Sequence, residues 1–302
     1  LDSIQHFNNS VLTIGSFDGM HRGHARIISD LKAMSEVNNI PSVVITFDPL
    51  PMTVLRSIGP SQRLLISPDK KIDYLNRQGI DYVLVIPFDK SFSKITAAEF
   101  LKVYILKYFN PMDIIIGYDA TFGYNRKGNK NFLINNMKEY GYNIHVKDPI
   151  LYLDTPISST RIRSYISNGN INEANTCLGF KYSISGIVVR GEGIGSQLGF
   201  PTANIKPHVP NLLFPTHGAY CVDAIIEDNS YVGMCNIGRR PTFYDDGKAI
   251  IEVHLFSKEP LNLYDKNITI KFKQFLRKEK KYNSITKLTN QLKLDSKACV
   301  AL

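Results

Sequence analysis

The first apolar segment of the chain runs directly into a glycine-rich loop and then into a stretch with helical periodicity. Residues 11–14, V-L-T-I, predict a short buried strand. After the loop at 15–24, G-S-F-D-G-M-H-R-G-H, apolar residues recur at helical spacing from Ile27 to Met34. A strand, a loop and a helix in immediate succession favour an α/β architecture with parallel strands.

This loop has the chemistry of an anion-binding site. Its glycines, Gly15, Gly19 and Gly23, let the backbone turn tightly and approach a ligand closely. The helix that follows offers unpaired N–H groups and the positive end of its dipole. His21 and His24 stand three residues apart at the helix start, so both imidazoles can face an anion bound there. We expect that anion to be a phosphate.

Other interpretations of the loop fit its spacing less well. It lacks the Gly-Lys-Ser/Thr ending of a Walker A loop, and its glycines are not spaced as in the dinucleotide-binding fingerprint. A zinc site at His-x-x-His would need further Cys or carboxylate ligands, and none is nearby in the sequence. Zinc binding and plain helix capping by the two histidines stay open as alternatives.

Residues 1–180 continue to alternate apolar strands with helical patterns, which predicts a doubly wound, Rossmann-like α/β domain. Further strands are expected at 42–47, 82–86 and 113–116, and helices at 70–78 and 96–108. Ligands of such sheets bind beyond the carboxyl ends of the strands. The loop at 117–123 should therefore meet the opening loop and residues 47–51 there. Asp119 in this loop can form an Asx turn after the strand.

A second helix start follows at residues 157–163, I-S-S-T-R-I-R. Ser158 or Ser159 can cap a helix that runs to Gly169. The first turn then carries Thr160, Arg161 and Arg163. Arginine suits a polyphosphate because its planar guanidinium donates paired, charge-assisted hydrogen bonds. A plain capped surface helix is the alternative.

From residue 181 the pattern changes to segments with a period of two, which predicts a second domain, 181–302, built as a small antiparallel β-barrel. Strands are expected at 184–190, 218–226, 231–237, 249–256 and 268–275, and one helix at 284–294. In residues 251–256 the alternation turns Glu252 and His254 away from the core.

The barrel sequence also contains a glycine-rich loop, G-E-G-I-G-S-Q-L-G at 191–199, followed by F-P-T-A-N at 200–204. The glycines alone are equally typical of a surface hairpin. If residues 200–204 are extended, however, Thr202 and Asn204 share one face. Their oxygens could then hold a hard cation together with phosphate oxygens.

Composition narrows the class of protein. The 302 residues are 43% hydrophobic, which is enough for sizeable cores, and no apolar run approaches a membrane span. The net charge of +9 allows nucleic acid binding, but the lysines are spread out and gather mainly at 271–281, as on a solvated surface. A basic surface also favours anionic small substrates such as ATP. The four cysteines lie far apart without a C-x-x-C pair, which predicts reduced thiols and a cytoplasmic protein.

These motifs together resemble a known family. The opening loop and I-S-S-T-R-I-R are similar to the two signatures of nucleotidylyltransferases, which attack the α-phosphate of a nucleoside triphosphate and release pyrophosphate. G-F-P-T-A-N is similar to the hallmark of riboflavin kinase domains. In this order they resemble the bacterial bifunctional riboflavin kinase/FMN adenylyltransferases, also called FAD synthetases. The resemblance covers nearly the whole chain.

The resemblance implies two reactions, with ATP, riboflavin and FMN as substrates. Residues 181–302 would phosphorylate riboflavin to FMN, with Glu252 as the base for the ribityl 5′-OH and Mg²⁺ on Thr202 and Asn204. Residues 1–180 would adenylylate FMN to FAD. The catalytic residues implied there are His21, His24, Arg161 and Arg163. The nucleotide-contacting residues implied are Gly15, Phe17, Asp18, Gly19, Gly23, Asp119, Ser158, Ser159, Thr160, Gly193, Gly195, Gly199, Phe200 and Pro201.

The chain departs from the family pattern at four positions. Leu50 stands where His is usual, Ser16 where Asn is frequent, and Ile194 and Ser196 where Arg is common. Losing arginines near a triphosphate predicts weaker ATP binding by the kinase. An FMN adenylyltransferase with a flavin-binding but inactive barrel, a nucleotidylyltransferase for another phosphorylated metabolite, and a nucleic-acid-binding regulator are the rival hypotheses. The favoured partners are small substrates, without nucleic acid or membrane, and a homo-oligomer is compatible with this assignment.

Overall fold

The structure is a computed structural model that describes residues 6–55, 63–191, 195, 199–239, 249–257 and 261–302. The chain divides into two compact units, Leu1–Ser159 and Thr160–Leu302. Among the described residues, no helix combines the length and the apolar character needed to cross a membrane.

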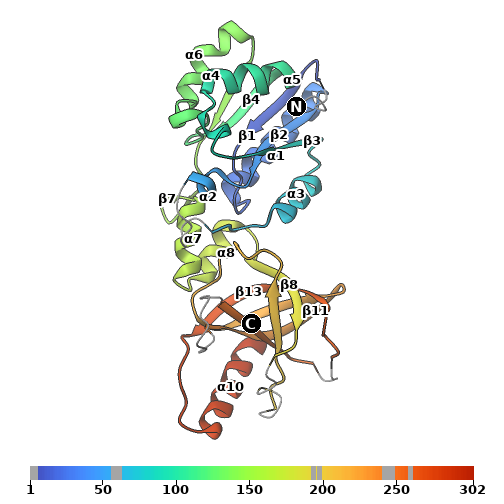
Figure 1. Cartoon of the computed structure of the whole chain (residues 1–302), viewed down its shortest axis with the longest axis vertical. Coiled ribbons are helices and arrows are strands. Elements are labelled where there is room, and N and C mark those ends of the chain that lie inside the picture. Colours follow the sequence, from blue (N-terminus) through green and yellow to red (C-terminus); the bar gives the residue numbers. More distant parts are fainter. Residues whose placement is uncertain (1–5, 56–62, 192–194, 196–198, 240–248, 258–260) are drawn as a thin grey trace. The chain divides into compact units, whose positions relative to one another are not determined.

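The first unit is built on a five-stranded parallel sheet (Figure 1). Its strands are β1 (Ser10–Ile14), β2 (Ser42–Asp48), β3 (Tyr82–Pro87), β4 (Pro111–Gly117) and β5 (Asn143–Lys147). The order β3-β2-β1-β4-β5 confirms the predicted doubly wound sheet, and adds β5 as a strand that the sequence analysis did not predict. From β1 the chain first adds β2 on one side of this strand, and it later adds β4 on the opposite side of β1. The topological switch point therefore lies between β1 and β4.

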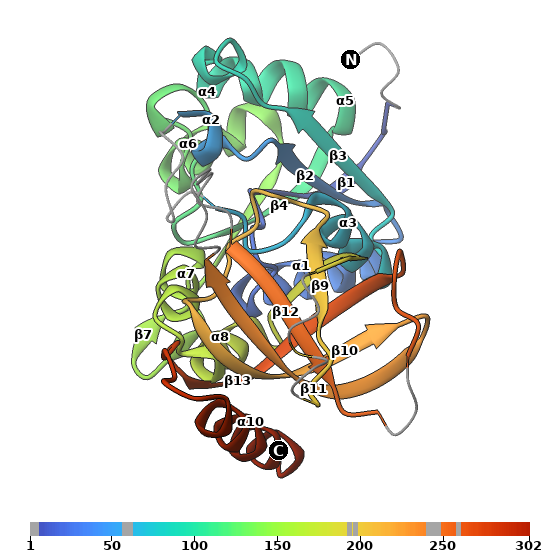
Figure 2. The ribbon, with the colours of Figure 1, turned by 60° about the horizontal axis from the view of Figure 1, so that its bottom comes forward.

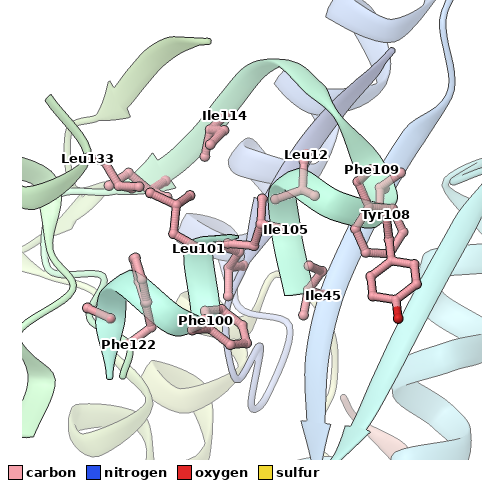
Figure 3. Packing of buried hydrophobic residues seen from close by; sticks show 14 of the residues in the cluster. Leu12, Ile45, Phe100, Leu101, Ile105, Tyr108, Phe109, Ile114, Phe122 and Leu133 are labelled. Atoms are coloured by element: carbon pink, nitrogen blue, oxygen red, sulfur yellow. The ribbon is translucent and has the colours of Figure 1, made fainter. Parts of the chain in front are cut away.

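Helices cover both faces of this sheet. They are α1 (Arg22–Asn38), α2 (Pro51–Leu55), α3 (Pro68–Arg77), α4 (Ala97–Glu99), the π-helical η3 (Phe100–Leu106), α5 (Lys107–Phe109) and α6 (Lys130–Tyr140). Successive side chains of β1 point to opposite faces of the sheet and so contribute to two hydrophobic cores. Val11 packs with residues of α1 and α3, whereas Leu12 packs with residues of η3 and α6. Figure 3 shows the second of these, where Ile105 of η3 lies near Leu12.

Short elements complete this unit. They are the 3₁₀ turns η2 (Phe92–Lys94) and η4 (Tyr124–Arg126), and the two-stranded pair β6 (Leu151–Tyr152) and β7 (Thr155–Pro156). The next helix, α7 (Ser159–Ser167), begins at the last residue of the first unit and continues in the second.

The second unit contains a closed antiparallel barrel, as predicted, with α8 (Ile171–Leu178) before it and α10 (Ile285–Val300) after it (Figure 2). The barrel strands are β8 (Ser183–Val189), β9 (Ala203–Pro207), β10 (Gly218–Ile226), β11 (Asn229–Arg239), β12 (Ala249–Leu255) and β13 (Asn267–Arg277). Their order around the barrel is β10-β11-β12-β9-β8-β13. The helix α10 packs against β10 and β11.

The expectation that all cysteines are reduced is wrong in this structure. Cys221 on β10 and Cys299 on α10 form a disulfide across 78 residues of sequence. The pairing arises because α10 packs on β10, a tertiary contact that the spacing of cysteines does not reveal. Cys177 and Cys235 are buried and take no part in this disulfide.

Candidate active sites

The loop between β1 and α1 has an unusual backbone conformation. Phe17 and Met20 adopt positive φ angles of 48° and 42°, which side chains with a Cβ rarely accept, and Gly19 adopts 83°. Both non-glycine residues are buried, at 3% and 0% exposure, so the surrounding core holds the loop in this shape. Backbone strain of this kind is typical of functional loops.

The two histidines lie together at the start of α1. His21 is the N-cap residue, and its Nδ1 accepts a hydrogen bond from the His24 N–H at 3.4 Å. The two rings stack with centroids 3.6 Å apart and planes tilted by 18°. Gly23 permits this arrangement, because a Cβ there would lie 3.1 Å from Cε1 of His21. Helix capping, an alternative in the sequence, is therefore present, and it fixes both imidazoles at the helix end.

The environment of His24 favours its neutral form. Burial lowers the pKa of this imidazole well below its usual value, and the neighbouring His21 and Lys71 lower the pKa further. Its Nδ1 is buried and has no hydrogen-bond partner among the described residues. At neutral pH His24 can thus offer a hydrogen bond to a ligand while contributing no charge.

Lys71 of α3 is a site residue that the sequence analysis missed. Its Nζ donates hydrogen bonds to Thr46 Oγ1 at 2.9 Å, to the Phe47 carbonyl at 3.3 Å and to the Ser16 carbonyl at 3.4 Å. The residue is only 3% exposed. Its spacing of four from the buried Leu75 was the available signal, since both fall on the inner face of α3.

A small pocket with about 220 Å³ of empty space, its open mouth included, lies beside this lysine. Asp18, Phe47, Asp48, Leu50, Leu64, Ile66, Pro68 and Lys71 line it. The departure from the family pattern at position 50 thus places a buried apolar side chain in the pocket wall. The pocket combines an apolar wall with two carboxylates and one ammonium.

Asp18 and Ser159 tie three segments of the first unit together. The Asp18 carboxylate accepts a hydrogen bond from the Leu65 N–H at 3.0 Å, and its carbonyl accepts one from Ser159 Oγ at 2.9 Å. The first residue of α7 is thereby held at the opening loop. Ser158 is half-buried beside it. Asp119 lies exposed in the loop after β4, the strand next to β1, so it stands at the switch point.

The remaining predicted residues of α7 belong to the second unit. Thr160 is exposed, and Arg163 is 5% exposed. Arg161 donates from Nε to the Tyr165 hydroxyl at 2.9 Å, with its guanidinium 5.3 Å from the centroid of that ring. This contact orients the Arg161 side chain along its own helix.

In the barrel, the predicted cation ligands and base lie on one face of neighbouring strands. Ala203 and Ile205 of β9 are buried, so Thr202 and Asn204 face the other way. Glu252 of β12 is half-buried on that face and stands directly opposite Asn204. Asn236 of β11 stands opposite Glu252 on its other side. Three polar side chains therefore form a row across β9, β12 and β11.

Glycines pack closely against this row. A Cβ on Gly191 would lie 1.9 Å from Nδ2 of Asn204, and one on Gly195 would lie 2.4 Å from the carbonyl of Phe200. The Phe200 N–H also donates to the Gly195 carbonyl at 2.9 Å. Gly199 has a φ of 77°.

Of the other residues predicted for this site, one contact is given by the structure among its described residues. The Pro201 carbonyl lies 2.8 Å from Nδ1 of His254. Gly193, Ile194 and Ser196 lie outside the described residues.

A Rossmann-like sheet with a strained loop and a helix start beside its switch point, together with a barrel that has a glycine-flanked polar row, is the architecture expected of a two-domain nucleotide-dependent transferase. Family models agree, since the FAD synthetase model matches residues 3–161 and the riboflavin kinase model matches residues 178–302. The chain belongs to the bifunctional riboflavin kinase/FMN adenylyltransferase family.

Relatives with that description match almost end to end. The chain is 37% identical over 297 residues to one from Buchnera aphidicola subsp. Schizaphis graminum, covering 95% of this chain and 92% of the relative. It is 32% identical over 293 residues to one from Bacillus subtilis, covering 96% and 92%. A crystal structure described as a macrolide-efflux protein from Streptococcus pneumoniae superposes with a TM-score of 0.90 at 29% identity, covering 100% of this chain and 97% of that one.

Proposed function

We propose that the chain converts riboflavin to FMN in residues 181–302 and FMN to FAD in residues 1–180, using ATP in both steps. The observation that carries the proposal is the match of both domain models to one chain, in the order of the relatives and over nearly its full length. We place the reactions in the cytoplasm, where ATP is supplied.

In adenylyl transfer an oxygen of the FMN phosphate attacks the α-phosphorus of ATP in line, and pyrophosphate leaves. The work of the protein is orientation and stabilisation of charge on the phosphate oxygens. The N–H groups at the start of α1 and a ring N–H of His24 supply neutral donors for this. Arg161 and Arg163 are the proposed cationic groups.

In the kinase reaction the ribityl 5′-oxygen attacks the γ-phosphorus of ATP, and ADP leaves. Glu252 accepts the hydroxyl proton, because a carboxylate within hydrogen-bond reach is a competent base for this transfer. Its place beside Asn204 supports this role, since the base and the phosphate-site residue come from paired positions on adjacent strands.

The residues present fit a Mg²⁺ ion. Thr202 and Asn204 provide neutral oxygens on one face, and Mg²⁺ is commonly held by few protein ligands together with substrate phosphates. Gly191 and Gly195 leave out the Cβ atoms that would fill the space around these side chains. When bound, Mg²⁺ would neutralise charge on the phosphate oxygens. Thr202 and Asn204 would hold it.

A product assay tests the proposal. Incubation with riboflavin and Mg-ATP, followed by chromatographic separation, should yield FMN and ADP first and then FAD and pyrophosphate. Formation of FAD from added FMN without any FMN from riboflavin would favour the adenylyltransferase-only alternative. The absence of both products would overturn the proposal.

A further inference from the structure

Lys71 places a buried ammonium between the opening loop and the end of β2. An ammonium has three N–H donors and no acceptor. In this structure Nζ has three oxygen acceptors, the carbonyls of Ser16 and Phe47 and the hydroxyl of Thr46. Burying a charge is costly unless the charged group is hydrogen-bonded. The three acceptors match the three N–H groups of the ammonium and so offset the cost of burying Lys71 here.

The contacts of Lys71 join two segments that the anion site needs in fixed positions. Ser16 precedes the strained residue Phe17 and belongs to the loop, whereas Thr46 and Phe47 lie in the last three residues of β2. The Ser16 carbonyl also accepts a hydrogen bond from Thr46 Oγ1 at 3.3 Å. The Ser16 carbonyl therefore accepts hydrogen bonds from two side chains, Thr46 of β2 and Lys71 of α3. Lys71 also bonds to β2, so it joins the start of the loop to that strand.

Three titratable groups face Lys71 from the elements around it. Burial lowers the pKa of Lys71, and the carboxylates of Asp18, in the loop, and Asp48, at the end of β2, oppose this shift in part. The third is His24 of α1, whose pKa falls chiefly through burial and then through His21 and Lys71. The ammonium therefore acts on His24 through charge as well as through the loop.

We propose that Lys71 is a positioning residue for adenylyl transfer, whose ammonium pins the Ser16 carbonyl to β2 and so fixes the loop that leads into His21 and His24. This inference rests on the proposed function of the first unit. Lys71 acts through the loop and through the protonation state of His24, and it needs no contact with substrate.

Two substitutions of Lys71 distinguish the effect of its charge from the effect of its size. Lys71→Met removes the donors and the charge at similar length, whereas Lys71→Arg keeps a cation. Arg77→Met, on an exposed position of the same helix, is the matched control. We expect Lys71→Met to lower kcat for FAD formation by about 10²-fold, as misplacement of a site by about an ångström does. Lys71→Arg should recover part of the loss, and Arg77→Met should match the wild type.

Two further readouts distinguish positioning from a general structural role. FMN formation from riboflavin should be unchanged in Lys71→Met, which shows that the barrel is folded, and a far-UV circular-dichroism spectrum like that of the wild type should show that the first unit keeps its helices. Because loss of the nearby cation removes one cause of the low pKa of His24, that pKa should rise in Lys71→Met and stay low in Lys71→Arg. NMR titration of the His24 ring measures it, and the acid limb of the FAD-formation pH profile should move to higher pH.

Equal kcat for Lys71→Met and the wild type would overturn the inference. Equal losses in the Met and Arg variants, with an unchanged His24 titration, would also overturn it. A wild-type chain that makes no FAD would instead overturn the proposed function. In that case the His24 titration would still decide whether Lys71 acts on the histidine pair.

Discussion

The two candidate sites are built by different means. In the first unit, the site consists of a strained loop and a helix start, held in place by hydrogen bonds from Leu65, Lys71 and Ser159 in distant parts of the sequence. In the barrel, Asn204 and Glu252 stand side by side because two strands pair in register. The loop site therefore depends on tertiary contacts, whereas the barrel site follows from strand alternation.

If the two sites are separate, the largest loss of a single activity is expected for substitution of Glu252. Glu252→Gln keeps the shape of the side chain but removes the base, so FMN formation should fall by about 10²- to 10⁴-fold, the usual contribution of a general base. Steady-state assay of ADP release with riboflavin measures this. FAD formation from added FMN serves as the internal control and should be unchanged. Unaltered FMN production would remove Glu252 as the base.

His24→Ala should affect the other site alone. Removal of one preorganised donor typically costs about 10²- to 10³-fold in rate, and we expect that loss in FAD formation from FMN. Riboflavin phosphorylation should stay at the wild-type rate. A parallel fall of both activities in a folded variant would contradict the assignment of separate sites.

Gly191→Ala tests the packing of the polar row. The added methyl group would lie 1.9 Å from Nδ2 of Asn204, so Asn204 must move away from its place beside Glu252. We expect FMN formation to fall by up to about 10²-fold, with a higher Mg²⁺ concentration needed for half-maximal rate. Titration of the rate with Mg²⁺ measures the shift. An unchanged Mg²⁺ dependence would argue against Asn204 as a ligand.

Ser159→Ala should have the smallest effect. It removes the hydrogen bond from Ser159 Oγ to the Asp18 carbonyl, which is worth about 0.5 to 1.5 kcal/mol. Denaturant unfolding should detect a loss of that size, accompanied by a fall in FAD formation of about tenfold or less. A larger loss of activity without any loss of stability would indicate that the hydroxyl contacts substrate directly.

The fold was predictable from the sequence because its strands and helices have clear periods. The strands β1 to β4 and five of the barrel strands follow from apolar runs or alternation near Val11, Val43 and Ile251. Four strands were missed, two of which, β6 and β7, have only two residues each. The other two were missed for local reasons. β5 has no fully buried residue, and β9 is short and ends at Pro207.

The chemistry of the two sites was predictable to different extents. Alternation alone indicated that Glu252 and Asn204 face away from the core. Periodicity could not reveal that Lys71 reaches Ser16, or that Cys221 meets Cys299, because both contacts join segments far apart in sequence. The stacking of His21 on His24 likewise depends on the loop conformation, which positive φ angles at Phe17 and Met20 set.

Complementation between two variants tests the existence of two separate sites most directly. Glu252→Gln should make FMN slowly and His24→Ala should make FAD slowly, so each variant alone should convert riboflavin to FAD at a small fraction of the wild-type rate. Mixed together with riboflavin and Mg-ATP, the two variants should produce FAD much faster than either alone, because FMN released by one variant serves the other. If the mixture makes FAD no faster than the single variants although each retains its other activity, the account of two independent sites is contradicted.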